Sequence, residues 1–586
     1  MGKGAERCSI FPARYNFWLM AIQLTPVDVA VIGLGAVGGV AVLPLARAGL
    51  KIAGIEAGTW MSPHDYRADE IYNNVRRMVT SVPKAQREIP TVRADASEKA
   101  RRAGAQHPMM NAVGGTSIHY WAQSWRLKPW DFQTRSESIR RYGPSSIPKG
   151  STLADWPITY EELEPYYDTI EWEVGVSGKA GNIQGRIDPN GNVFEGPRQR
   201  EYPMPPLRST DFIDRMSDAA KRLGWHPFHP PAAINTESRD HRPGCAYHGY
   251  CGTGGCHVNA KCSTAVTTIP AAVKTKDLTI FDLAHVTRIM ADANGRVTGV
   301  SYIRNRQEYF QPAKVVLLAG YTYENTRLLL LSKSRAHPNG LSNRRGQVGK
   351  HFFAHYQTAP TALFPFDVNI WYGLPAQGVT VDDFADDAYD HTGLGFIGGT
   401  SLHVRTERHP IEGAEMATYG KGPRWGAAWK KFVHENAARV ANTYLQTSTF
   451  PYDTCYLDLD PEVKDPLGDP VCRITTGGPK QNELSAIRHA HQKMEQWFRE
   501  AGAVAVDAQG PGVPALTTHA YGGIRMGDDP DANVVNRWGF SHEIPNLGIL
   551  GASVMGTSGA RNPTLTAQAL AWRTAEYAVK NWKALT

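Results

Sequence analysis

The segment Val27–Gly58, VDVAVIGLGAVGGVAVLPLARAGLKIAGIEAG, decides the fold of this chain. An apolar strand leads into Gly33-x-Gly35-x-x-Gly38, a helix of small residues follows, and a second strand ends in Glu56. Gly33 allows a tight turn, Gly35 lets the backbone approach a pyrophosphate, and Gly38 lets the helix and strand pack closely. The start of the helix offers free N–H groups and the positive end of its dipole to phosphates.

The acid at the end of the second strand completes this pattern. Glu56 is placed to accept hydrogen bonds from the ribose hydroxyls of an adenine dinucleotide. A Gly-rich turn in some other α/β unit is the alternative for the glycines alone. Together, the two strands, the helix and the acid predict a dinucleotide site.

Composition limits the classes of protein to which the chain can belong. Its 586 residues are enough for about two to four domains with large cores. Charged residues make up 20% and aromatic residues 10%, which is typical of globular proteins. The net charge of +7 is dispersed, so the sequence gives little support to nucleic-acid binding. We expect no membrane span, since no stretch reaches the ~18–20 apolar residues that one needs, and no signal peptide.

Later segments predict more of the parallel sheet and, after it, a separate antiparallel sheet. Apolar strands are expected at 278–281, 297–303 and 314–318. The last enters a small-residue turn and a helix, a pattern that suits a parallel sheet with a ligand at its carboxyl edge. Residues 351–510 alternate as antiparallel strands do and include a long helix at 481–501. We therefore predict an α/β fold (α+β overall), with a discontinuous Rossmann-like domain and a substrate domain on an antiparallel sheet. The predicted bounds are 1–25 for an N-terminal extension, 26–135, 241–350 and 511–586 for the dinucleotide domain, and 136–240 and 351–510 for the substrate domain.

The C-terminal segment contains the motifs that point to a family. These are Thr518-His519-Ala-Tyr-Gly522-Gly523, Asn546-Leu-Gly-Ile-Leu-Gly551-Ala552-Ser553 and Ala560-Arg-Asn562-Pro563-Thr564. Together with the glycine motif and KVVLLAGYTYENTRLLLLS at 314–332, they resemble the glucose–methanol–choline (GMC) flavoprotein oxidoreductases. The resemblance covers nearly the whole chain after about residue 25, and it implies a GMC-type fold with FAD as the dinucleotide.

The resemblance also implies a catalytic pair, His519 and Asn562. Oxidation of an alcohol by a flavin needs a group that takes the hydroxyl proton while hydride leaves the carbon. A neutral imidazole suits this task, and an amide can orient the substrate oxygen without competing as a base. We therefore expect His519 to act as the general base and Asn562 as its orienting partner.

The turn Asn111-Ala-Val-Gly-Gly-Thr-Ser-Ile-His119 resembles the segment that lies against the flavin ring in GMC relatives. His119 is either a non-covalent neighbour of the flavin or its covalent attachment point, and both readings stay open. The cofactor-binding residues that the motifs and the resemblance imply are Gly33, Gly35, Gly38, Glu56, Gly58, Gly114, Gly115, Ser117, His119, Val286, Ala319, Gly551, Ala552 and Thr564.

Three long strings, at 125–143, 158–182 and 194–207, resemble in particular the large flavin subunits of membrane-bound gluconate 2-dehydrogenases. Such subunits work with a small escort subunit that carries the export signal and with a multihaem cytochrome c subunit. The resemblance therefore implies both partners and a place at the periplasmic face of the inner membrane. A soluble cytoplasmic protein is the alternative.

Four of the seven cysteines fall between 245 and 262, and the odd total argues against a simple disulfide framework. The loop resembles the Cys-rich loop of that subfamily, which implies a [3Fe-4S] cluster held by Cys245, Cys251 and Cys256. His248 and Cys262 are further candidate ligands. A zinc site and structural or disulfide-bonded cysteines remain as alternatives.

The resemblance leads to one principal function and two alternatives. We expect an FAD-dependent dehydrogenase that oxidises a hydroxyl of a sugar, sugar acid or glycoside and passes electrons to the iron–sulfur cluster and the cytochrome. A soluble oxidase resembling pyranose oxidase, using O2, is the first alternative. A flavin electron-transfer subunit without substrate turnover is the second. Neither the substrate nor the reacting hydroxyl follows from the fold.

Overall fold

The structure is a computed structural model of the chain. It describes residues 21–79, 89–103, 109–371, 373–407, 409–416, 423–508 and 517–586. Most of the predicted N-terminal extension, residues 1–20, therefore lies outside the described residues. No helix among the described residues is long and apolar enough to cross a membrane.

The first sheet has eight strands and contains the glycine motif at the end of one of its central strands. Its order is β10 (Ala284–Ala291), β11 (Val297–Arg304), β12 (Gln307–Leu318), β2 (Val27–Ile32), β3 (Ile52–Ile55) and β9 (Leu278–Phe281), with β1 (Ile22–Gln23) and β23 (Leu547–Ile549) also paired to β12. β12, β2, β3, β9 and β23 pair in parallel, whereas β10, β11 and β12 form an antiparallel meander. The predicted parallel sheet, assembled from distant segments, is confirmed for β9 and β12, whereas the predicted strand at 297–303 is β11, which pairs antiparallel on both sides.

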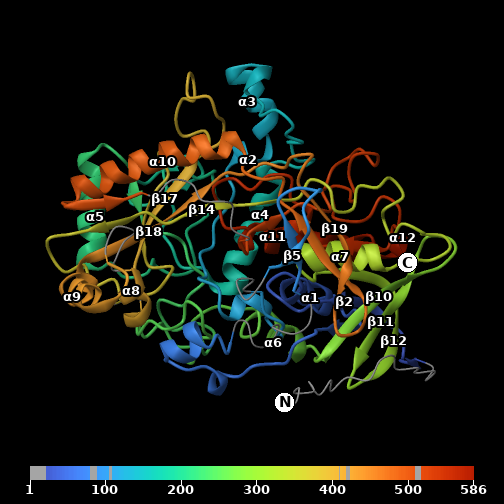
Figure 1. Ribbon diagram of the computed structural model, residues 1–586. Helices are drawn as coiled ribbons and strands as arrows, with labels where there is room; N and C mark the ends of the chain where they lie inside the picture. Colours follow the sequence, from blue (N-terminus) through green and yellow to red (C-terminus); the bar gives the residue numbers. More distant parts are fainter. Residues whose placement is uncertain are drawn as a thin grey trace, which may run out of the picture.

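Helices cover this sheet and make the adjoining core. α1 (Gly38–Arg47) packs against α6 (Thr268–Lys274) and α11 (Thr564–Lys580), and α11 packs against α4 (Tyr160–Ile170). α7 (Thr322–Leu331) contacts β10 and also a four-stranded sheet (Figure 1). That sheet has the order β19 (Tyr456–Lys464), β20 (Pro470–Thr475), β4 (Thr91–Arg93) and β5 (Arg101–Arg102).

The second large sheet is wholly antiparallel, as predicted for residues 351–510. Its order is β21 (Ala505–Asp507), β15 (Thr361–Leu363), β18 (Val440–Thr447), β17 (Thr400–Arg405), β16 (Gly378–Val381) and β8 (Pro227–Phe228), with β14 (Tyr356–Thr358) also paired to β18. α5 (Asp211–Arg222) and α10 (Gln481–Glu500) pack against each other and against this sheet, on the left of Figure 1. Trp497 and Phe498 of α10 are fully buried in the resulting core.

A short ladder at the active site joins chain segments that are far apart in sequence. β13 (Phe353–Ala354) leads into β14 of the antiparallel sheet, and it pairs with β22 (Ala520–Tyr521). The ladder therefore brings the residue after β13 beside the residue before β22. The remaining elements are α2 (Pro129–Phe132), α3 (Thr134–Tyr142), β6 (Asn182–Ile183), β7 (Arg186–Ile187), α8 (Pro410–Met416), α9 (Gly426–Asn436) and α12 (Trp582–Leu585).

Candidate active site

Two adjoining cavities lie where the predicted cofactor and catalytic residues meet. The larger has a volume of about 790 Å³ and is lined by His519, Asn562 and His119. The smaller has a volume of about 200 Å³ and is lined by Glu56 and Val286. The two share a set of lining residues, so they form one elongated space: Ala36, Val37, Met109, Thr116, Ala319 and Tyr321. Such a space matches the extended shape of a dinucleotide.

The glycine motif packs so closely that side chains are excluded. A Cβ atom on Gly38 would lie 1.9 Å from the carbonyl oxygen of Gly33, and Gly33 itself has φ +87°. A Cβ atom on Gly115 would lie 2.8 Å from Cα of Gly35. No side chain caps the start of α1, so its N-terminal N–H groups face a bare backbone cradle of the kind that holds phosphates.

Glu56 has a structural task that the sequence did not reveal. Its two carboxylate oxygens accept hydrogen bonds from the backbone N–H groups of Leu34 and Gly58, each at 2.9 Å. The carboxylate therefore ties the glycine loop to the end of β3. It also lines the smaller cavity beside Val286, where its remaining lone pairs can receive ribose hydroxyls.

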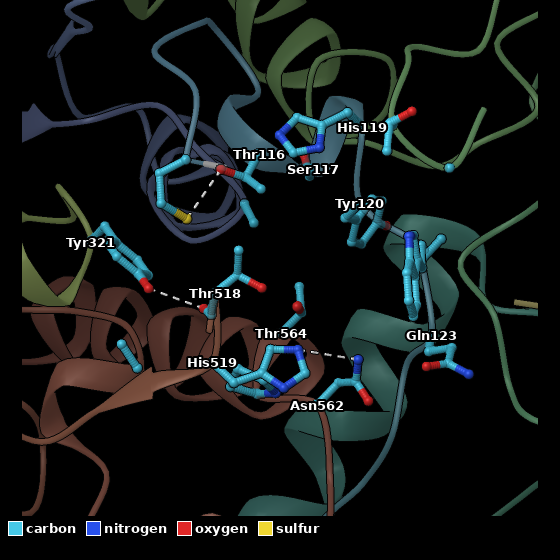
Figure 2. Close-up of a pocket in the computed structure, with 18 of the residues that line it drawn as sticks. Thr116, Ser117, His119, Tyr120, Gln123, Tyr321, Thr518, His519, Asn562 and Thr564 are labelled. Carbon is cyan, nitrogen blue, oxygen red and sulfur yellow. Dashed lines mark hydrogen bonds between the residues drawn. The ribbon is translucent and has the colours of Figure 1, made fainter. Parts of the chain in front are cut away.

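The turn before His119 lies against the glycine loop. The hydroxyl of Ser117 is buried and donates to the carbonyl oxygen of Gly114 at 2.5 Å, and it accepts from the N–H of Thr264 at 3.3 Å. Ser117 therefore shapes the turn. His119 lines the larger cavity across from His519 and Asn562 (Figure 2).

The other predicted cofactor residues lie around the same space. Ala319 borders both cavities, and Gly551, Ala552 and Thr564 border the larger one. Thr564 is the first residue of α11, whose start has no side-chain cap, so the positive end of that helix dipole faces the cavity. Gly58 is not among the residues that line either cavity; it packs against the turn that begins at Asn111, whose carbonyl oxygen would lie 1.9 Å from a Cβ atom at Gly58.

The predicted catalytic pair is brought together. The amide nitrogen Nδ2 of Asn562 lies 3.3 Å from Nε2 of His519 (Figure 2). Burial lowers the pKa of His519 from 6.5 to about 3, so its imidazole is neutral at neutral pH. The Oδ1 atom of Asn562 is buried and has no hydrogen-bond partner among the described residues. A neutral base and an orientable amide therefore share one wall of the cavity.

Two neighbours of His519, and a tyrosine bonded to one of them, were not found from the sequence. Nδ1 of His355 lies 3.1 Å from Nδ1 of His519, and Nε2 of Gln357 lies 3.0 Å from the same atom. The Gln357 amide also donates to the hydroxyl of Tyr444, which lines the cavity too. These residues lie beside β13, on β14 and on β18. The β13–β22 pairing places His355 beside His519, and no local sequence pattern signals that pairing.

The cysteine loop borders the larger cavity through Gly252 and Thr253. The thiol of Cys262 donates to Oδ1 of Asn235 at 3.2 Å, and the sulfur of Cys245 accepts from the N–H of Tyr247 at 3.4 Å. Burial raises the pKa of Cys245 to about 11 and that of Cys251 to about 12. In the described part of the chain, no three His, Cys, Asp or Glu side chains are gathered as metal ligands. Because its cysteine side chains are not gathered around one point, the loop in this arrangement does not fit an iron–sulfur cluster.

The cavities, in contrast, fit FAD. The backbone cradle at the glycine motif suits a pyrophosphate, Glu56 with Val286 suits an adenosine, and the larger cavity is wide enough for a ring system beside His519. The residues that would hold the group thus come from both ends of the chain.

Comparison with known proteins agrees with this geometry. Two family models described as GMC oxidoreductase match residues 154–357 and 451–571. The gluconate 2-dehydrogenase flavoprotein of Pantoea cypripedii is 31% identical over 95% of this chain and 94% of its own length. The 2-methyl-1,2-propanediol dehydrogenase of Mycolicibacterium austroafricanum is 29% identical over 95% and 96%. The fructose dehydrogenase large subunit of Gluconobacter japonicus is 26% identical over 96% and 100%.

Among solved structures, pyridoxine 4-oxidase from Mesorbium loti shares the fold, with a TM-score of 0.60 at 16% identity over 94% of this chain and 99% of that one. The matched family segments include β8 of the antiparallel sheet, the predicted catalytic pair and the start of α11. On this sequence similarity and this site, the chain belongs to the GMC oxidoreductase family.

Proposed function

We propose that this protein is an FAD-dependent dehydrogenase that oxidises a hydroxyl group of a neutral sugar or glycoside. The observation that supports this most is the pairing of His519 Nε2 with the Asn562 amide, in a cavity continuous with the dinucleotide space. The family acts on CH–OH groups, and its members include the dehydrogenases to which this chain is similar.

The roles of the two residues follow from their chemistry. His519 takes the hydroxyl proton at Nε2, because its imidazole is neutral and that atom faces the cavity. Asn562 donates to the substrate oxygen through Nδ2 and holds it within reach of His519. When bound, FAD supplies the acceptor for the hydride that leaves the same carbon. The cavity wall keeps His519 away from bulk water, which preserves its neutral form.

The lining residues favour a neutral, hydroxyl-rich substrate. Around His519, the cavity presents amides and aromatic rings that can hydrogen-bond and stack on a sugar: Gln123, Gln357, Asn562, Trp121 and Tyr444. Arg77 is the one Lys or Arg among the described lining residues. Arg77 is itself exposed and lies two residues after Val75, which is 61% exposed. Arg77 therefore belongs to the outer part of the site. A carboxylate beside the reacting carbon would find little charge compensation.

The electron acceptor is a separate part of the proposal. The three relatives described above are named dehydrogenases, and one of them is named a large subunit; these names support an acceptor other than oxygen, although other relatives are named oxidases. We infer an escort subunit and a cytochrome c partner, and with them a place at the periplasmic face of the inner membrane. Co-purification of the native protein tests this: isolation as a single chain from the soluble cytoplasmic fraction would contradict it.

The [3Fe-4S] cluster rests on the resemblance of the cysteine loop alone, and we route no step through it. Analysis for iron and acid-labile sulfide decides the matter. About three irons per chain would support the cluster, whereas absorbance from flavin alone would contradict it. Denaturation with acid tests whether the flavin is bonded covalently to His119 or only lies beside it, since a covalently bound flavin stays with the precipitated protein.

Anaerobic bleaching of the flavin tests the central claim. Neutral hexoses, glycosides and aldonates are mixed with the holoenzyme, and we expect bleaching with a neutral member of the panel. His519→Ala should reduce the rate by about 10²- to 10⁴-fold, the usual contribution of a general base. His434→Ala, on the exposed face of α9, is the matched control. Unchanged bleaching in His519→Ala would refute the base; equal rates of dye and oxygen reduction would favour an oxidase.

A further inference from the structure

A second buried histidine contacts the candidate base on the side away from the substrate. His355 follows β13 and His519 precedes β22, so the β13–β22 ladder fixes their relative position. The backbone N–H of His355 donates to the carbonyl oxygen of His519 at 3.2 Å. Their rings meet edge to face, with centroids 5.3 Å apart, and the two Nδ1 atoms are separated by 3.1 Å. The contact is thus set by main-chain pairing as well as by side-chain packing.

The protons of His355 can be assigned from the carbonyl oxygen that faces its Nε2 atom. Nε2 of His355 lies 2.9 Å from the carbonyl oxygen of Gly559. A carbonyl oxygen only accepts, so Nε2 must carry the hydrogen. His355 is fully buried, and burial together with the nearby His519 ring keeps its pKa well below 6.5. A neutral imidazole has one N–H, so Nδ1 of His355 is a bare acceptor.

This assignment determines the tautomer of His519. The hydroxyl of Tyr521 lies 3.3 Å from Nδ1 of His355, but it donates its one hydrogen to the carbonyl oxygen of Arg561 at 2.9 Å. The donor to the bare Nδ1 of His355 is therefore His519, whose hydrogen lies on Nδ1. Nε2 of His519 is then bare, and it can accept from Asn562 Nδ2 at 3.3 Å. The nitrogen beside Asn562, which lines the cavity, is therefore the one that carries the lone pair.

Gln357 offers the competing arrangement. Its Nε2 lies 3.0 Å from His519 Nδ1, and a hydrogen bond from it would need a bare Nδ1. The hydrogen would then lie on Nε2 of His519, opposite the donor Nδ2 of Asn562, and the Nδ1 lone pairs of the two histidines would face each other. That tautomer satisfies the contact with Gln357 and violates the contacts with His355 and Asn562. The tautomer set by His355 satisfies two and violates one.

We propose that His355 is a positioning residue. Its Nδ1 atom accepts a hydrogen bond from the Nδ1–H group of His519, which keeps Nε2 of His519 unprotonated toward the substrate hydroxyl. The inference rests on the proposed function. When the substrate proton passes to Nε2, the Nδ1–H of the resulting imidazolium still donates to His355. His355 itself gains and loses no proton.

Nitrogen-15 NMR of histidine-labelled wild-type holoenzyme tests the tautomer directly, without any substitution. We expect the Nδ1 signal of His519, assigned by its loss in His519→Ala, to be of the protonated type, with Nε2 of the unprotonated type. The reverse pattern overturns the inference.

A pair of variants tests the same point by kinetics. His355→Asn keeps an acceptor oxygen near the position of Nδ1, whereas His355→Leu keeps the bulk and loses the acceptor. We expect His355→Leu to slow flavin bleaching by about 10- to 100-fold, a part of what a general base contributes, with KM changed less than about threefold. His355→Asn should restore most of the rate. Equal rates in both variants and wild type would overturn the inference.

The controls separate the two claims. If His519→Ala abolishes bleaching and His355→Leu does not slow it, the base stands and the positioning role fails. If His519→Ala bleaches normally, the proposed function fails. Gln357→Leu should mainly raise KM, because Gln357 lines the cavity. Loss of rate in Gln357→Leu with none in His355→Leu would support the opposite tautomer. If His355→Leu does not retain flavin, the NMR result decides.

Discussion

The guanidinium of Arg561 forms a two-pronged ion pair with the carboxylate of Asp382, with N–O distances of 2.5 and 3.1 Å. Both side chains are buried. Arg561 precedes the candidate catalytic Asn562, and Asp382 follows β16 in the antiparallel sheet. The ion pair thus anchors the catalytic loop to the other large sheet. Ser401 and Asn192 donate to the same carboxylate at 2.5 and 2.7 Å, so its lone pairs are well satisfied.

Asp382→Asn should destabilise the protein and misplace Asn562. Removing one partner of a buried pair leaves an uncompensated charge, which typically costs about 3–5 kcal/mol. We expect a lower melting temperature and slower flavin bleaching. The matched control is Asp367→Asn, which breaks the exposed Asp367–Arg439 pair at 3.3 Å and should change little. Equal melting temperatures of the two variants would show that the buried pair anchors nothing.

Gly115→Ala should weaken the binding of FAD. Its Cβ would lie 2.8 Å from Cα of Gly35, so the two backbone loops that form the cradle must move apart. Overpacking of this kind typically costs about 1–3 kcal/mol. When this cost destabilises the FAD-bound form, the affinity for FAD drops about 10- to 100-fold. Flavin per chain after dialysis measures this.

Gly224→Ala is the control for backbone strain alone. Gly224 has φ +78° and follows α5, but a Cβ atom added there would have no neighbour within 4 Å. This variant should lose some stability and keep its flavin. Flavin loss of the same size in both variants would mean that the Gly115–Gly35 contact is not the cause.

The sequence predicts best what local pattern determines. The strand Leu278–Phe281 and the helix at 481 were predicted within a residue, because apolar alternation and helical periodicity are local signals. The glycine motif and the pairing of His519 with Asn562 were also predicted in place, the second through family resemblance. His355 was not, because its role depends on a two-residue ladder between distant segments. Asp382 was missed for the same reason, since its partner is far along the chain.

Buried histidines should make the folded protein sensitive to mild acid. Burial, first among the causes, lowers the pKa of His351, His403 and His519 from 6.5 to about 3. Between these two values the unfolded chain binds protons that the folded protein does not. Stability must therefore fall as pH falls below about 6.5, by about 1.4 kcal/mol per pH unit for His403, which is buried, and by less for the half-buried His351 and His519. Urea unfolding at pH 7.5, 6.5, 5.5 and 5.0 measures the slope.

His403→Gln provides the internal check on that slope. The variant removes one titrating group from the core of the antiparallel sheet, so it should flatten the pH dependence by about one proton. Its absolute stability is irrelevant to the test. Stability of the wild-type protein that stays constant down to pH 5.0 would show that these imidazoles titrate normally.

Asn562→Asp should convert a flat pH–rate profile into a rising one. In the wild type, His519 is neutral above about pH 4, so the rate of flavin bleaching should not vary between pH 5 and 8. A carboxylate in place of the amide, 3.3 Å from Nε2 in the present geometry, would favour the imidazolium. An opposite charge at this distance raises the pKa of a histidine by about 1–3 units.

The base of Asn562→Asp is then protonated, and unable to act, below its new pKa, so the rate should rise with pH through about 4–6. Asn562→Ala is the matched control, since it removes the amide without adding charge. It should lower the rate at every pH and leave the profile flat. A rising limb in Asn562→Ala as well would mean that the low pKa of His519 depends on the amide, and a flat profile in Asn562→Asp would show that Nε2 does not take the proton.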